Sequence, residues 1–120
     1  MIKQVLSDDI IKQYLPILTA CPLFNTLGIP ELTSYLHNAK VIINNYKKND
    51  FIAISGDPME GIGVILEGSA LLTRENVLGQ RVIMANLEAS SIFGEALLFS
   101  KHPLWPATIK ALKPTKIMFI

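Results

Sequence analysis

Residues 92–111 decide the fold of this chain and read Ile-Phe-Gly-Glu-Ala-Leu-Leu-Phe-Ser-Lys-His-Pro-Leu-Trp-Pro-Ala-Thr-Ile-Lys-Ala. The stretch predicts a short strand at 92–93, a glycine turn, a short helix over 95–100, a loop, and a second strand over 107–111. A glycine between a strand and a helix leaves backbone N–H groups free to point at an anion. Glu95 then places a carboxylate at the start of the helix, where it either caps the helix or accepts hydrogen bonds from a ligand hydroxyl. On its own, a Gly-Glu pair more often marks an ordinary turn and helix cap than a ligand site.

The first forty residues have the spacing of helices. Apolar residues at 10, 11, 14, 15 and 18 follow Ser7-Asp8-Asp9, which predicts a helix with Ser7 or Asp8 as its N-cap. The segment 21–28 predicts a second short helix that ends at Gly28. Residues 30–38 predict a third helix, with its buried face formed by Leu32, Tyr35 and Leu36.

From residue 41 onward the pattern changes to short apolar runs separated by glycine and proline turns. Strands are predicted over 41–46, 51–54, 62–66, 70–73, 81–85 and 116–120, with a hairpin loop at 75–79 and a short connector at 87–91. The run 62–66 is apolar throughout, which predicts burial on much of both faces. We therefore expect a mainly β protein with N-terminal helices. It has a helical lead-in over 1–37 and, over 38–120, an antiparallel double-stranded β-roll of the jelly-roll or cupin-like kind with one short helix.

Two segments together resemble a known family. The segment 93–99 with 108–111 is similar to the phosphate-binding cassette of cyclic nucleotide-binding domains, and Gly56 to Gly68 matches the glycine-to-glycine strand segment of that family in spacing. The chain resembles most the sensor domain of Crp/Fnr-type bacterial transcription regulators, over residues 21–120. The resemblance implies a β-roll effector domain whose helical lead-in packs against the end of the roll.

The resemblance also implies roles for individual residues. The family's cassette holds the cyclic phosphate with an arginine, a Ser or Thr hydroxyl and backbone N–H groups, and holds the ribose with the glutamate after the glycine. Gly94 and Glu95 match these positions, and the backbone N–H of Ala96 follows them. Trp105 stands where the arginine is expected, and Pro106 stands where the hydroxyl residue is expected.

These two departures argue against the family's usual ligand. Charge-assisted hydrogen bonds contribute about 1.5–3 kcal/mol each, so the loss of the arginine lowers affinity for a cyclic nucleotide by roughly two orders of magnitude or more. Lys101 and Lys110 are the nearest cations; Lys110 is expected to point out of the roll, which leaves Lys101 as the better substitute. We expect that cyclic AMP and cyclic GMP do not bind in the standard way.

Two interpretations of Trp105 remain open. In one, it lines a pocket for an apolar or aromatic acid together with Phe93, Phe99 and Met84. In the other, which we favour, the indole fills the vacated phosphate site as part of the core. The predicted ligand-binding residues are Met84, Gly94, Glu95, Ala96, Trp105 and Pro106.

Composition narrows the classes of function. The chain has 120 residues, which fits one domain, and its net charge of +1 gives no electrostatic footprint for DNA or for an acidic membrane. A single cysteine, Cys21, excludes an internal disulfide and suits the reducing cytoplasm. No stretch approaches the ~20 apolar residues of a membrane span.

The sequence predicts neither an enzyme nor a cofactor site. His37 and His102 lie 65 positions apart, outside any metal-ligand spacing. No Ser-His-Asp set, carboxylate pair or phosphate-loop lysine can be assembled, so we assign no catalytic residue, metal ligand or cofactor. A redox role for Cys21 finds no support, because no positive neighbour in the sequence lowers its pKa.

We therefore expect a non-enzymatic effector domain that responds to a small molecule not identified by the sequence. The chain ends within the apolar run 117–120, which favours a piece of a longer protein. The resemblance implies a homodimer and DNA binding through a dimerisation helix and a helix-turn-helix domain that this chain lacks. Two alternatives stay open: a cupin-like small-molecule-binding or metal-dependent enzyme barrel, and a degenerate roll that acts only as a dimerisation scaffold.

Overall fold

A computed structural model of the protein describes residues 4–59, 61–95 and 100–120. The helices and strands follow one another along the chain in this order: β1 (Gln4–Val5), α1 (Asp8–Ala20), α2 (Ile29–Asn38), β2 (Lys40–Tyr46), β3 (Phe51–Ala53), β4 (Gly63–Glu67), β5 (Ser69–Glu75), β6 (Arg81–Glu88), β7 (Ile92–Phe93), β8 (Thr108–Ala111) and β9 (Thr115–Phe119). The helix predicted over 95–100 lies mostly outside the described residues.

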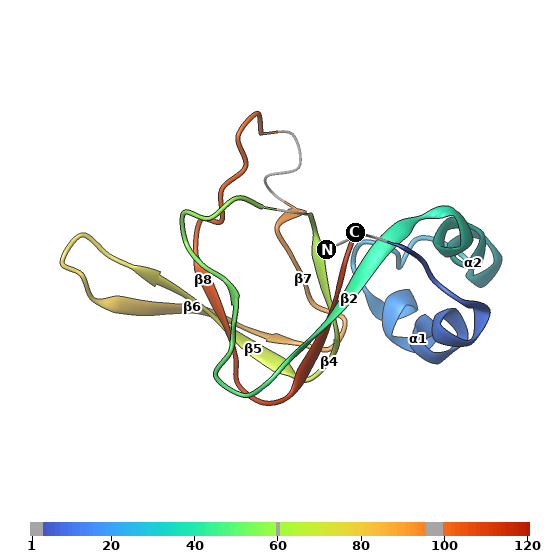
Figure 1. The fold of residues 1–120 in the computed structure, drawn as a ribbon, viewed down its shortest axis with the longest axis horizontal. Coiled ribbons are helices and arrows are strands. Elements are labelled where there is room, and N and C mark those ends of the chain that lie inside the picture. The colour runs from blue at the N-terminus through green and yellow to red at the C-terminus, as the bar shows by residue number, and fades with distance from the viewer. Residues whose placement is uncertain (1–3, 60, 96–99) are drawn as a thin grey trace.

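The strands form two antiparallel sheets, which together make up the roll. One sheet has the order β1-β2-β9-β4-β7 and the other the order β3-β8-β5-β6. Figure 1 shows α1 and α2 together at one end of the roll, while the β5–β6 hairpin projects at the opposite end. The predicted fold class, an antiparallel β-roll with N-terminal helices, is confirmed.

The two helices begin where the sequence signals them. Ser7 accepts a hydrogen bond from the backbone N–H of Ile10 at the start of α1, and Asp8 and Asp9 lie in the first turn, where the helix dipole favours negative charge. The helix α2 follows Gly28 and carries Pro30 in its first turn, where the missing N–H has no intrahelical partner to lose.

The core has two parts on opposite faces of the larger sheet. We call the first the helix-side core; it is formed by Ile11, Tyr14, Leu18, Cys21, Phe24, Leu32, Leu36, Val41, Val64, Leu66 and Met118. We call the second the roll-side core; it is formed by Ala53, Ile65, Ala70, Leu87, Phe93, Trp105, Ile109, Ile117 and Phe119. Alternate residues of β4 and β9 belong to different parts, so both strands are buried on both faces, as the apolar run at 62–66 predicted for β4.

Two local predictions of secondary structure were wrong, as was the burial of Tyr35, which is 43% exposed on α2. The segment 21–28 is a series of turns rather than a helix, with backbone hydrogen bonds from Phe24 to Cys21 and from Leu27 to Phe24 that close after three residues. The strand β6 continues through the predicted connector, because Leu87 and Glu88 pair with the start of β5. The sequence pattern also missed β1, a two-residue strand that pairs with β2 and draws its stability from that partner.

Candidate functional site

A cavity of about 270 Å³, which we call the effector cavity, lies inside the roll beside the turn after β7. Its walls are mostly apolar and come from β5, β6, β7, β8 and the loop before β8: Leu72, Arg74, Met84, Leu87, Ile92, Phe93, Gly94, Glu95, Trp105, Pro106, Ala107 and Ile109. Among these, Arg74 and Glu95 carry the charges. Among the described lining residues, the cavity therefore offers one cationic and one anionic group, both on exposed residues, beside apolar walls.

The structure brings the predicted ligand-binding residues together. Met84, Gly94, Glu95, Trp105 and Pro106 all line the effector cavity. Ala96 and Phe99 lie outside the described residues. Residues 84, 94–95 and 105–106 are far apart in the sequence. They line one cavity because the β-roll brings their strands and loops together.

Residue 94 needs to be a glycine for two reasons, its backbone conformation and the close packing around it. Its φ of +90° lies in the left-handed region that favours glycine. A Cβ at this position would lie 2.9 Å from the methyl carbon of Met59 and 3.2 Å from the indole ring of Trp105. The indole therefore packs directly against the glycine turn, and a side chain at residue 94 would displace it.

Trp105 is both a core residue and a cavity wall. It is 8% exposed, and its ring centroid lies 5.6 Å from that of Phe93 in a tilted arrangement. Phe93 in turn contacts Phe119 edge to face at 5.9 Å. Such aromatic pairs stabilise by roughly 0.5–1.5 kcal/mol beyond the area they bury. The two interpretations of Trp105 are thus compatible, because the indole fills core space and still borders the cavity.

Backbone hydrogen bonds fix Trp105 to the loop after β3. The N–H of Trp105 donates to the carbonyl oxygen of Asp57 at 2.8 Å, and the N–H of Gly56 donates to the carbonyl oxygen of Trp105 at 2.8 Å. The N–H of Met59 extends this pairing by donating to Pro103 at 2.9 Å. These bonds fix the backbone that carries the indole to the loop 54–59.

A bulge in β6 explains how Met84 reaches the cavity. Ala85 is opposite Leu72 and Ile83 is opposite Thr73, so Met84 is the extra residue in the ladder. Without a bulge, Met84 and Leu87 would point to opposite faces because they are three residues apart. The irregularity lets both side chains line the same cavity.

Arg74 is the functional candidate that the sequence analysis missed. Lys110 lies on the outer face of the sheet, as expected, and Lys101 is exposed and does not line the effector cavity. The cation at the cavity comes instead from β5. Simple strand alternation places Arg74 on the same side as Leu72, and this signal was available in the sequence.

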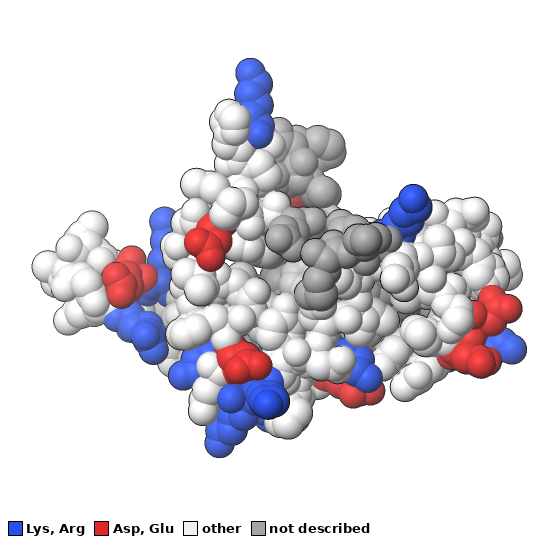
Figure 2. All heavy atoms as spheres, viewed as in Figure 1, with Lys and Arg blue, Asp and Glu red and all other residues white. Residues whose placement is uncertain are grey.

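Neither charged group of the cavity has a partner within the described part of the chain. No salt bridge or hydrogen bond involves the side chains of Arg74 or Glu95 there; the salt bridge found among those residues joins His37 to Asp8 at the helices. Figure 2 shows basic and acidic side chains scattered over the visible face. The two charges of the cavity are thus available to a ligand.

Other candidate chemistry is not assembled in the described residues. No group of three or more His, Cys, Asp or Glu side chains among them lies close enough to hold a metal ion. Burial raises the pKa of the Cys21 thiol, which lies fully inside the helix-side core, so the thiol stays protonated and serves packing. No helix within the described ranges is long and apolar enough to cross a membrane.

Comparison with protein families gives a match over most of the roll. The model of the cyclic nucleotide-binding domain matches residues 43–120, which is well over half of the chain. Among curated proteins, none matches the chain significantly in sequence.

Solved structures share the fold. The sensor domain of the transcriptional regulator DNR from Pseudomonas aeruginosa superposes with a TM-score of 0.75 at 22% identity, covering 92% of this chain and 72% of that one. The N-terminal domain of a transcriptional regulator from Streptomyces coelicolor A3(2) gives 0.69 at 28% identity, covering 85% and 69%. A candidate cyclic nucleotide-binding protein from Ruegeria pomeroyi gives 0.78 at 19% identity, covering 92% of this chain but 47% of its own length. This chain thus spans about half of that protein.

Proposed function

The chain belongs to the cyclic nucleotide-binding domain family, and from that premise we propose that it is the effector-sensing domain of a Crp/Fnr-type transcription regulator, working without the family's standard cyclic nucleotide contacts. Similarity to the sensor domain of DNR and to the N-terminal domain of the Streptomyces regulator supports the regulatory role. In this proposal the domain is cytoplasmic and non-enzymatic. It acts within a homodimer and controls DNA binding by a domain outside this chain.

One observation supports the proposal that cyclic nucleotides do not bind to this domain in the family's standard way. Trp105, at the position that matches the family's phosphate-binding arginine, packs against Gly94 in the space beside Glu95. An indole provides one N–H donor and no charge, and Pro106 provides no hydroxyl and no backbone N–H. A phosphodiester at this turn would lose its charged partner and meet a ring instead.

The lining favours a small, largely apolar acid with a hydroxyl or amine group. Arg74 can pair with a carboxylate or phosphate in bidentate geometry, and Glu95 can accept a hydrogen bond from a ligand donor. The remaining walls are aliphatic, aromatic or glycine. A volume of about 270 Å³ lies just below the usual range of ligand pockets, which favours a ligand smaller than a nucleotide.

Trp105 would connect occupancy of the cavity to the rest of the domain. A ligand that shifts the backbone of Trp105 would also move the loop 54–59, because backbone hydrogen bonds join Trp105 to Gly56 and Asp57. By the resemblance, the cassette would then shift against a dimerisation helix and bias the regulator between two states.

A thermal-shift panel tests this function. We expect at least one compound among apolar monocarboxylates that carry a hydroxyl or amine group, such as mandelate and phenylalanine, to raise the melting temperature by several degrees, because ligands that bind only the native state stabilise it. Arg74→Gln should abolish the shift, while Arg81→Gln, on the next strand and outside the effector cavity, should retain it. If no acid, nucleotide or haem stabilises the domain, the scaffold alternative replaces the sensor. A stoichiometric bound metal would favour the cupin-like enzyme.

A further inference from the structure

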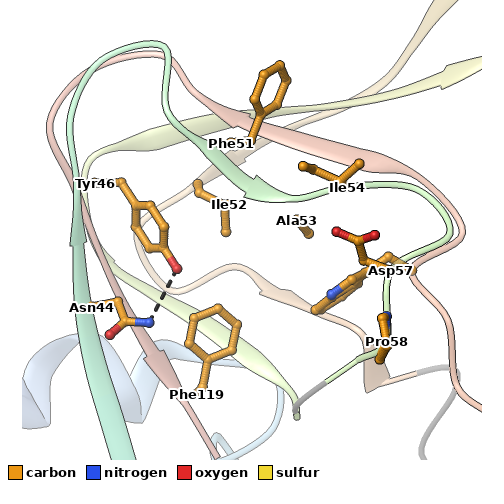
Figure 3. Close-up of a pocket in the computed structure, with 10 residues that line it drawn as sticks. Asn44, Tyr46, Phe51, Ile52, Ala53, Ile54, Asp57, Pro58 and Phe119 are labelled. Atoms are coloured by element: carbon orange, nitrogen blue, oxygen red, sulfur yellow. Dashed lines mark hydrogen bonds between the residues drawn. The ribbon is translucent and has the colours of Figure 1, made fainter. Parts of the chain in front are cut away.

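We propose that a second cavity, which shares Trp105 with the effector cavity, binds a small organic cation that has an aromatic or apolar body. This amine cavity has a volume of about 270 Å³ and is lined by Asn44, Tyr46, Phe51, Ile52, Ala53, Ile54, Asp57, Pro58, Trp105 and Phe119 (Figure 3). The proposal concerns a site separate from the proposed effector function and stands without it.

Aromatic side chains form the walls of the amine cavity. Figure 3 shows the rings of Tyr46 and Phe119 beside the cavity, while the ring of Phe51 points away from them. Trp105 is a third aromatic wall. A cation within about 6 Å of such rings is attracted by their π-electrons, most strongly for tryptophan.

Asp57 gives the amine cavity its charge. Among the described lining residues it is the one that carries a charge, and Figure 3 shows its carboxylate on the far side of the cavity from Tyr46. Its backbone is held at both ends, since its N–H donates to Ile54 at 3.0 Å and its carbonyl oxygen accepts from Trp105 at 2.8 Å. Within the described ranges, its side chain forms no hydrogen bond or ion pair, so the carboxylate is available to a bound cation.

The rest of the lining is compatible with a cation and unfavourable for an anion. Asn44 donates its amide N–H to the hydroxyl oxygen of Tyr46 at 3.4 Å, which directs the amide toward the tyrosine. The lining, as far as the structure describes it, contains no lysine, arginine or histidine. One carboxylate is too few for a calcium or magnesium site, which needs six or more oxygen ligands. An organic ammonium ion needs only this carboxylate and the ring faces.

Intrinsic fluorescence provides a direct test, because Trp105 is the single tryptophan of the chain. Benzylamine, benzyl alcohol and benzoate share one ring and differ in charge, and each is titrated at constant ionic strength. We expect saturable fluorescence change with benzylamine and binding of benzyl alcohol about five- to tenfold weaker. Benzoate is titrated into Arg74→Gln, whose effector cavity lacks its cation, and should give no saturation there. Equal affinity for benzylamine and benzyl alcohol, or no saturable change with benzylamine, would overturn the proposal.

Variants show which of the two cavities binds the amine. They are needed because Trp105 also borders the effector cavity, which has a carboxylate of its own on Glu95. Asp57→Asn should remove the preference for benzylamine over benzyl alcohol. Glu95→Gln and the matched surface control Glu88→Gln should leave it within twofold of the wild type. If Glu95→Gln removes the preference and Asp57→Asn does not, the amine binds in the effector cavity and the proposal is wrong.

A second measurement uses only the wild-type chain, so it still locates the site if Asp57→Asn alters the loop 54–59. Amide chemical shifts of the wild-type chain, titrated with benzylamine, should change most at Ala53, Ile54 and Asp57. Larger changes at Leu72 and Glu95 would contradict the proposal. Failure of the effector panel would leave these outcomes unaffected, so the two proposals are tested separately.

Discussion

The helix-side core and the roll-side core are built on the same two strands yet differ in how completely they are filled. Leu18, Leu32 and Leu36 of the first are fully buried, with 0% exposure. Leu87, Trp105 and Phe119 of the second retain 7–8% exposure, because cavities reach them. One sheet thus separates a closely packed region from a region that borders two cavities.

The largest expected effect tests the packed region. Leu36→Ala should lower the free energy of unfolding by about 2–5 kcal/mol, since the rigid helix-side core cannot collapse around the lost side chain. That is a large part of the roughly 5–15 kcal/mol that stabilises a domain. Urea unfolding followed by circular dichroism measures the change. A cost below about 1 kcal/mol would mean that the helices contribute little to stability.

A substitution at Gly94, which lines the effector cavity and packs against Trp105, should lower the free energy of unfolding somewhat less than Leu36→Ala. Gly94→Ala imposes a positive φ on a residue with a side chain and pushes a methyl group against Trp105, which we expect to cost about 1–3 kcal/mol. The same variant should shift the emission of Trp105. Unchanged stability and unchanged emission together would contradict the packing of the indole on the glycine turn.

The cavity wall should tolerate truncation better than the packed core. Leu87→Ala removes as many atoms as Leu36→Ala, but the new space joins a cavity that solvent already reaches. We expect a loss of about 2 kcal/mol, at the low end of the roughly 2–5 kcal/mol for such substitutions. Equal losses in the two variants, measured by the same urea titration, would break the comparison between the two cores.

The smallest expected effect concerns a contact between α1 and the roll. Lys116 donates to the hydroxyl of Tyr14 at 3.0 Å, and this hydrogen bond raises the pKa of the lysine. A raised folded-state pKa means that the stabilisation is present below the lysine's ordinary pKa of 10.5 and is lost as pH rises through the folded-state value. Wild type and Lys116→Met should differ in melting temperature by one or two degrees at pH 7. Because the stabilisation is fully present below 10.5, a difference that shrinks between pH 6 and pH 9 would contradict this assignment.

The sequence predicted the parts of the fold that local chemistry controls. Glycine turns, apolar alternation and the N-cap at Ser7 gave the roll, most strands and α1. The two-residue strand β1 and the end of β6 were missed, because pairing with a neighbour rather than local preference makes them strands.

The candidate site was predicted mainly through the cassette motif. Gly94, Glu95 and Trp105 stood out by their spacing in the cassette. Arg74 lies outside the motifs, although alternation along β5 placed it beside Leu72, and Asp57 lies in the Gly56–Gly68 segment, to which no ligand contact was assigned. The bulge at Met84 likewise depends on the pairing of two strands.

The most direct test of the altered cassette is calorimetric titration of the chain with cyclic AMP. The account predicts no saturable heat at micromolar concentrations, because an indole occupies the position of the charged phosphate partner. A micromolar dissociation constant that Glu95→Ala abolishes would contradict it, since the ligand would then be held in the family's usual way.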